Sequence, residues 1–114
     1  MDTLRLFFPQ WQGSGSERAK ELLTGAMSLK SLLLSSMTEL ETEDVETETS
    51  NNILRYADIV LNLEEALHVI QEAKPKKLVT IGGDCGVDAA PITYLNKVYK
   101  DLAVVWIDAH ADLN

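Results

Sequence analysis

The end of the sequence carries an alternation of residue types that bind divalent metal ions. Asp108, His110 and Asp112 are separated by single alanines and follow the apolar run Leu102–Ile107. In an extended chain, side chains two residues apart point to the same side, so two carboxylates and one imidazole would converge. Such a set suits a cation such as Mn, Fe or Zn. The alternative is a polar strand end facing water, which the apolar run disfavours because it would hold the cluster at a buried rim.

A second polar cluster, Gly82-Gly83-Asp84-Cys85, follows the apolar run Lys77–Ile81. The two glycines permit a tight turn and a close approach of the backbone. A phosphate-binding loop is disfavoured, because the third glycine and the lysine of the known fingerprints are missing. Two interpretations of Cys85 stay open. It is either a small buried apolar residue or a thiolate that binds metal or acts as a nucleophile near a helix N-terminus.

The elements around these clusters indicate how they would meet. Lys77–Ile81 is typical of a strand, Gly86–Tyr99 of a helix and Leu102–Ile107 of a strand covered on both faces. A strand, a helix and a strand within about thirty residues predict two parallel strands joined by a right-handed crossover. Both clusters would then lie at the carboxyl edge of the sheet, where open α/β sheets bind ligands. We therefore expect Cys85 and Asp108 at one edge.

The first half of the sequence supplies the elements that would pack against this unit. Leu4–Phe8, stopped by Pro9, is typical of a buried strand. Ser14 and Glu17 have the spacing of a capping box, and the apolar residues that follow recur at helical spacing. Asp58–Ala73 also has helical periodicity, with His68 beside its apolar stripe, and we interpret that histidine as a surface or half-buried residue and not as a metal ligand. The prediction is one α/β domain.

The segment of about residues 38–50 is strongly acidic. Between Glu39 and Glu48 six of ten residues are acidic. Interspersed threonines give a weak two-residue alternation, so we expect an exposed loop or edge strand and not a cation site.

Composition bounds the class of protein. The chain has 114 residues, of which 46% are hydrophobic and 25% charged, as in an ordinary globular domain or part of one. The net charge of -8 argues against nucleic acid and anionic membranes as partners. No apolar run approaches the ~20 residues of a membrane span. The single cysteine excludes an internal disulfide, and the N-terminus lacks the pattern of a signal peptide, so we expect a cytoplasmic protein.

The two clusters together resemble motifs of the arginase/agmatinase/formiminoglutamase (ureohydrolase) family. Gly82-Gly83-Asp84-Cys85 is similar to a Gly-Gly-Asp-His motif, and Trp106 to Asn114 is similar to an Asp-Ala-His-x-Asp-x-Asn motif at the end of an apolar strand. The resemblance is strong over residues 78–114. It implies a three-layer α/β/α fold with a mostly parallel sheet, of which residues 1–114 would be the N-terminal, incomplete part.

The resemblance also implies a chemistry. A binuclear manganese centre would activate a hydroxide that attacks the carbon of a guanidino or amidino substrate and releases urea or a similar product. Asp108 would bind both metals, Asp112 the first metal and His110 the second. Asp112 would also help to pass a proton as a catalytic residue, and Asn114 would contact the amino-acid end of the substrate.

Two departures from the family pattern keep alternatives open. Cys85 replaces a histidine ligand, and because a thiolate is soft, it favours Zn over Mn. In the family, further metal-binding carboxylates come from an Asp-x-Asp motif that lies later in the chain. The 114 residues do not contain this motif, so we expect this chain alone to be inactive. The alternatives are a non-catalytic arginase-like binding or assembly protein and a small unrelated α/β metal-binding domain. Since Leu102–Ile107 needs neighbours, we expect the chain to form a homo-oligomer.

Overall fold

The computed structural model describes residues 2–33, 35–42 and 47–110. Its elements in chain order are β1 (Thr3–Phe8), α1 (Glu21–Ser31), β2 (Thr38–Glu39), α2 (Tyr56–Ala73), β3 (Lys77–Gly82), the short 3-10 helix η1 (Cys85–Asp88) and α3 (Ala89–Val98). No helix among the described residues is long and apolar enough to cross a membrane.

The strands form one parallel sheet in the order β2-β1-β3. β1 is central and pairs with β3 along its whole length, from Thr3 opposite Lys77 to Phe8 opposite Gly82. The expectation of a buried strand at Leu4–Phe8 is confirmed, because Leu6 is fully buried and Phe8 is only 2% exposed. β1 therefore fixes the position of the loop that follows it, relative to the loop that follows β3.

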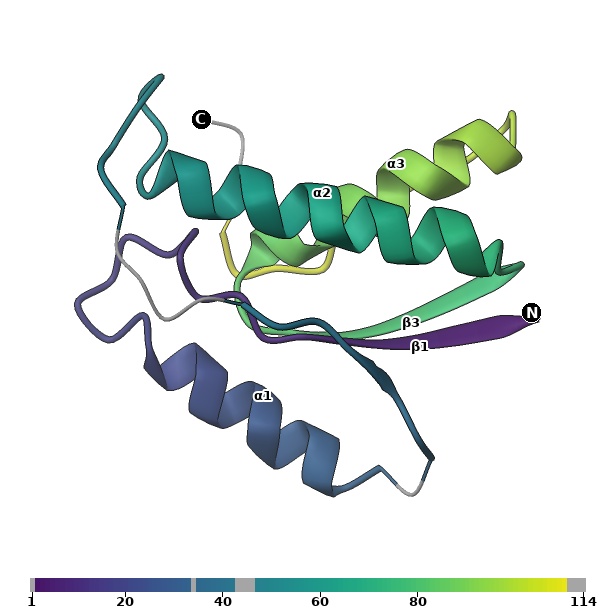
Figure 1. Ribbon diagram of the computed structural model, residues 1–114, viewed down its shortest axis with the longest axis horizontal. Helices are drawn as coiled ribbons and strands as arrows, with labels where there is room; N and C mark the ends of the chain where they lie inside the picture. The colour runs from purple at the N-terminus through teal and green to yellow at the C-terminus, as the bar shows by residue number, and fades with distance from the viewer. Residues whose placement is uncertain (1, 34, 43–46, 111–114) are drawn as a thin grey trace.

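The helices cover both faces of this sheet. α1 lies on one face, and α2 and α3 pack together on the other (Figure 1). The core between β1 and the α2–α3 layer contains the following buried residues: Leu4, Leu6, Phe8, Leu40, Ala66, Ile70, Val87, Ala90 and Tyr94. This is the three-layer α/β/α arrangement expected from the sequence, with an incomplete sheet.

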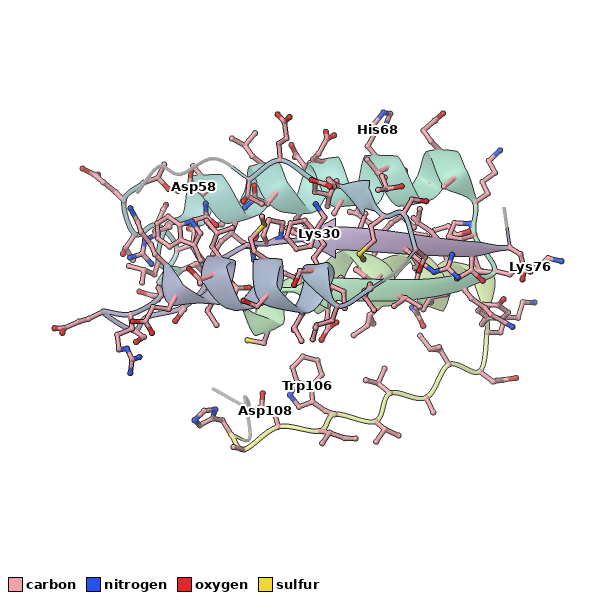
Figure 2. The ribbon with its side chains drawn as sticks, turned by 90° about the horizontal axis from the view of Figure 1, so that it is seen from below. Lys30, Asp58, His68, Lys76, Trp106 and Asp108 are labelled. Carbon is pink, nitrogen blue, oxygen red and sulfur yellow. The ribbon has the colours of Figure 1, made fainter. Side chains whose placement is uncertain are left out.

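The segment Leu102–Ile107 is the main correction to the sequence prediction. It runs from the Lys76 end to the Asp108 end of the molecule, but it forms no strand (Figure 2). Val105 is 84% exposed and Ile107 94% exposed, so the expected cover on both faces is missing as well. The apolar run indicates a need for burial, but it does not specify which backbone will pair with the segment. The prediction of two adjacent parallel strands is therefore wrong.

The helices differ from expectation mainly at their ends. α2 confirms the helix predicted over Asp58–Ala73, and the helix predicted over Gly86–Tyr99 divides into η1 and α3. α1 begins only at Glu21, and no side chain caps its first turn. The Ser14 hydroxyl instead accepts a hydrogen bond from Ser16 N, so the predicted capping box is wrong. Because α1 covers a small sheet, Ala26 is its single buried residue in the part of the chain that the structure describes.

The acidic side chains of the segment 38–50 are exposed where they are described, although Leu40 between them is buried in the core. β2 makes an edge strand of Thr38 and Glu39, and Glu39, Glu41 and Glu48 all face solvent. Glu43, Asp44 and Glu46 lie outside the described residues.

Candidate metal site

Cys85 lies at the start of η1, directly after the turn that ends β3. It is exposed and not part of a disulfide, so the buried interpretation of this cysteine is wrong. The turn brings the backbone of Gly83 against the loop that follows β1. A Cβ atom at Gly83 would lie 1.9 Å from the carbonyl oxygen of Gln10, so only glycine fits there. The Gly-Gly pair thus allows a close approach between two backbones, as its composition indicates.

Asp84 joins these two loops through its carboxylate. Its Oδ1 accepts hydrogen bonds from Gln10 Nε2 at 2.8 Å and from Gly86 N at 2.9 Å. Its Oδ2 accepts one from Gly13 N at 2.7 Å. Burial raises the pKa of the Asp84 carboxyl, while the hydrogen bonds from Gln10, Gly13 and Gly86 act to lower that pKa. Since three donors point at its two oxygens, the ionised carboxylate matches the geometry best.

A buried amide chain supports Asp84 from the helical layer. Asn62 Nδ2, on α2, donates to Gln10 Oε1 at 3.1 Å, and Gln10 Nε2 then donates to Asp84. Gln10 is 1% exposed, and Asn62 and Asp84 are each 7% exposed. The Asn62 contact orients the Gln10 amide, because its oxygen must face Asn62 and its nitrogen must face the carboxylate.

Asp108 and His110 are brought together by a bend and not by extended alternation. The chain bends at Ala109 and His110. His110 N donates to Asp108 Oδ1 at 2.8 Å, and His110 Nδ1 lies 3.3 Å from the same oxygen. The side chain of His110 is 84% exposed and that of Asp108 is 25% exposed. The imidazole and the carboxylate are therefore neighbours at an accessible position.

Both predicted clusters face one open cavity of about 250 Å³ at the carboxyl end of β3. Its lining comes from three separate parts of the chain: Gly13, Ser14, Leu22, Gly83, Asp84, Cys85, Asp108 and His110. Cys85 and Asp108 therefore meet at this edge although Leu102–Ile107 does not pair with β3. The expected convergence is correct, and the expected sheet pairing behind it is wrong.

The cavity lining contains side chains of the types that bind divalent metals. A thiol, a carboxylate and an imidazole line it together. Among the described residues, however, no three side chains of His, Cys, Asp or Glu stand close enough together to hold an ion. Asp112 and Asn114, the remaining predicted site residues, lie outside the described part of the chain.

A larger cavity of about 500 Å³ lies elsewhere and contains none of the predicted site residues. It is lined by Glu39, Glu41, Asp58, Leu61, Asn62 and Glu65. The smaller cavity is the candidate functional site, because it gathers residues from both motifs. His68, which we expected to be a surface or half-buried residue, is exposed on α2.

The sequence missed the supporting role of Asp84, Gln10 and Asn62. Asp84 belongs to the motif Gly82-Gly83-Asp84-Cys85, and the signal for its role was its place directly after the glycine pair. Neither Gln10 nor Asn62 carries a local pattern that points to the site. Their partners lie 74 and 52 residues away along the chain, so only the folded structure reveals the contacts.

Comparison with known proteins agrees with the two motifs. A model of the arginase family matches residues 13–114. The chain is 35% identical over 66 residues to an arginase of Plasmodium berghei (strain Anka), which covers 55% of this chain and 19% of that protein. It is 43% identical over 53 residues to a hepatic arginase of Aquarana catesbeiana, covering 45% of this chain and 16% of the relative.

An arginase of Schizosaccharomyces pombe (strain 972 / ATCC 24843) is 43% identical over 47 residues, covering 40% of this chain and 15% of the relative. The matched stretches thus span less than a fifth of each of these three relatives. The family match covers most of the chain, including the loops that carry Cys85, Asp108 and His110. The chain belongs to the arginase family.

Proposed function

We propose that this chain supplies part of the active site of a ureohydrolase, which hydrolyses a C–N bond of a guanidino or amidino substrate. The observation that carries the proposal is the single cavity lined by Cys85, Asp108 and His110 at the carboxyl end of β3. Family membership supports it, since the curated relatives are named arginases. The net charge of -8 also favours a cationic substrate such as a guanidinium group.

The proposed cofactor is a binuclear manganese centre, held in part by Asp108, His110 and Asp112. Two such cations lower the pKa of bound water and stabilise the charge that develops on the attacked group. The side chains of this chain would hold and orient the reacting groups. The Asp108 carboxylate accepts the backbone N–H of His110, which keeps the two side chains on one side of the bend. In the proposal Asp112 moves a proton and Asn114 binds the amino-acid end of the substrate.

Cys85 bears on the choice of metal. Its thiolate would be a soft ligand, so Zn should bind more tightly than Mn at its position. Cys85 also favours a second candidate function, an arginase-like protein that binds ligands or partners without catalysis, because it stands where the family motif has histidine. Urea release by a longer protein that contains this sequence would separate the two functions.

We further propose that residues 1–114 form the N-terminal part of one arginase-like domain and that the chain alone is inactive. The carboxylates of the later Asp-x-Asp motif, which the resemblance to the family requires, are not among its residues. The chain therefore supplies too few ligands to hold two metals tightly. Weak metal binding without turnover is the expected behaviour.

Association of the chain with a second copy is part of this proposal. Val105 and Ile107 are almost fully exposed, and β3 is an edge strand of the described sheet. An unpaired strand edge beside exposed apolar side chains drives pairing with another chain. Light scattering across a dilution series should show a mass above that of the 12.6 kDa monomer at high concentration. A monodisperse monomer with a cooperative melt would contradict the association.

Calorimetric titration with Zn²⁺ and Mn²⁺, combined with a urea assay, tests the proposed function. The 114-residue chain should bind Zn²⁺ more tightly than Mn²⁺ and release no urea from arginine or agmatine. Cys85→Ser should weaken Zn²⁺ binding most, and His110→Ala should weaken the binding of both metals. His68→Ala is the matched control and should change neither.

Two outcomes would count against the proposal. Equal effects of His110→Ala and His68→Ala would show that the metal binds elsewhere. Clear turnover by the chain alone would show that the later motif is not needed. A longer protein that contains this sequence, binds metal and releases no urea would favour the non-catalytic alternative.

A further inference from the structure

Two loops that are far apart in sequence meet at Asp84. The first, Gln10–Ser14, follows β1, and the second, Gly83–Gly86, follows β3 and runs into η1. The Asp84 backbone N–H donates to Gln10 O at 2.8 Å, and the side-chain carboxylate accepts from donors in both loops. The contacts from Gln10 and Gly13 span 74 and 71 residues of sequence. One residue thus connects the two loops through both its backbone and its side chain.

Three glycines make room for this junction. A Cβ atom at Gly13 would lie 2.7 Å from Asp84 Oδ2, and one at Gly86 would lie 3.0 Å from Asp84 Oδ1. A Cβ atom at Gly83 would overlap the Gln10 carbonyl. The sequence therefore places glycine at each point where the backbone approaches Asp84 or its partner. This coincidence indicates that the local sequence is built around the carboxylate.

Both loops are walls of the cavity that contains the candidate metal ligands. Gly13 and Ser14 line one side, and Gly83, Asp84 and Cys85 line another. Cys85 stands between Asp84 and Gly86, whose N–H the same carboxylate accepts. Any movement of Asp84 would therefore displace Cys85 relative to Asp108 and His110. It would also break the hydrogen bond that holds Gly13 in the other wall of the cavity.

We propose that Asp84 is a positioning residue, whose buried carboxylate fixes the two loop walls of the site cavity relative to each other. The inference deepens the proposed function and rests on it for the identity of the bound metal. Asp84 acts through Cys85 and Gly13, because donors from the two loops occupy both of its oxygens. Replacing a residue that orients metal ligands without touching the metal typically lowers the metal affinity by about 10- to 100-fold.

The chain offers a matched control for Asp84. Asp58, on α2, is 5% exposed, and its Oδ2 accepts hydrogen bonds from Thr47 N at 3.1 Å and from Thr47 Oγ1 at 3.0 Å. It is thus an equally buried aspartate with backbone and side-chain donors, and it does not line the site cavity. Asp58→Asn and Asp84→Asn remove one charge each from comparable surroundings.

The experiment compares the wild-type chain, Asp84→Asn and Asp58→Asn in two measurements. Zn²⁺ affinity by calorimetry should fall by about 10-fold or more in Asp84→Asn and stay within about twofold in Asp58→Asn. In the metal-free protein, amide exchange of at least one of Gly13 and Gly86 should accelerate by roughly 10-fold in Asp84→Asn alone, because those two donors point at different oxygens and an asparagine side chain keeps only one acceptor oxygen.

A milder variant covers the case in which Asp84→Asn fails to fold. Asn62→Ala leaves the carboxylate in place but removes the contact that orients the Gln10 amide. It should weaken Zn²⁺ binding and accelerate Gly13 exchange in the same direction, by roughly 2- to 10-fold. The inference would be overturned if whichever of Asp84→Asn and Asn62→Ala folds binds Zn²⁺ with the wild-type affinity. It would also be overturned if Asp58→Asn lost as much Zn²⁺ affinity as Asp84→Asn.

The two arms also separate this inference from the proposed function. If the wild-type chain binds no Zn²⁺, the proposed function fails, and the exchange rates alone decide the role of Asp84. Unchanged exchange at Gly13 and Gly86 would overturn it in that case. If Zn²⁺ affinity falls in Asp84→Asn while exchange at both glycines stays normal, Asp84 is a direct ligand and not a positioning residue.

Discussion

β1 and the segment Leu102–Ile107 are both mainly apolar, but they lie in opposite environments. Both are short apolar runs, and both precede residues that line the site cavity. β1 pairs with β2 on one edge and β3 on the other, and Leu6 is fully buried. Leu102–Ile107 lies outside the sheet, with Ile107 94% exposed (Figure 2). An apolar run thus requires cover, but neighbouring strands determine whether it becomes part of the sheet.

The largest expected contrast between the two segments concerns stability. Leu6→Ala in β1 should lower the free energy of unfolding by about 2–5 kcal/mol, because it leaves a cavity in the core. Val105→Ala should change it by no more than about 0.5 kcal/mol, because that side chain is 84% exposed. Urea denaturation of the two variants measures the difference. A large loss in Val105→Ala would show that the segment is buried in solution.

The type of each helix or strand could be predicted from the sequence better than the elements that pack or pair with it. The runs at Leu4–Phe8 and Lys77–Ile81 and the periodicity of Asp58–Ala73 gave correct strands and a correct helix, because local pattern decides the type of element. The prediction of a strand at Leu102–Ile107 was wrong, because strand pairing depends on residues that are distant in sequence. In the candidate site, the motifs singled out Cys85, Asp108 and His110, which line the cavity. The motifs did not indicate Gln10 and Asn62, since their role exists only through contacts between distant parts of the chain.

We expect the next largest change in the free energy of unfolding at Gly83, where the backbones of the two loops approach each other closely. Gly83→Ala should cost roughly 3 kcal/mol of unfolding free energy, because the new Cβ atom would overlap a backbone carbonyl that cannot move alone. Gly25→Ala, inside α1 with nothing within 4 Å of the new atom, should stabilise the chain by ~1 kcal/mol. Thermal melts of both variants test this pair, and a harmless Gly83→Ala would contradict the close junction of the two loops.

Arg55 provides a smaller test of how firmly the first loop is held. Its guanidinium donates to Gln12 O at 3.2 Å and to Ser14 O at 2.9 Å, and it lies 5.0 Å from the centre of the Trp11 ring. Arg55 also has a positive φ of 53°, which costs free energy and persists only where contacts hold it.

Arg55→Lys should lower the free energy of unfolding by about 1 kcal/mol, because an ammonium group cannot reproduce the planar fork. Lys20→Met, which removes the other cation over Trp11 and keeps most of the stem, should cost no more than about 0.5 kcal/mol. Denaturant titration compares the two variants. If Lys20→Met proves the more damaging, the guanidinium does not hold the loop.

The imidazole signals of the two histidines test the central claim most directly, which is that Cys85, Asp108 and His110 form part of a metal site. The sequence contains two histidines, and Figure 2 shows His68 on the side of the molecule opposite Asp108. In a Zn²⁺ titration followed by long-range nitrogen–proton NMR, the His110 ring signals should shift at metal concentrations that leave His68 unchanged. Cys85→Ser should raise the Zn²⁺ concentration needed. Equal shifts of both histidines at every Zn²⁺ concentration would contradict the account.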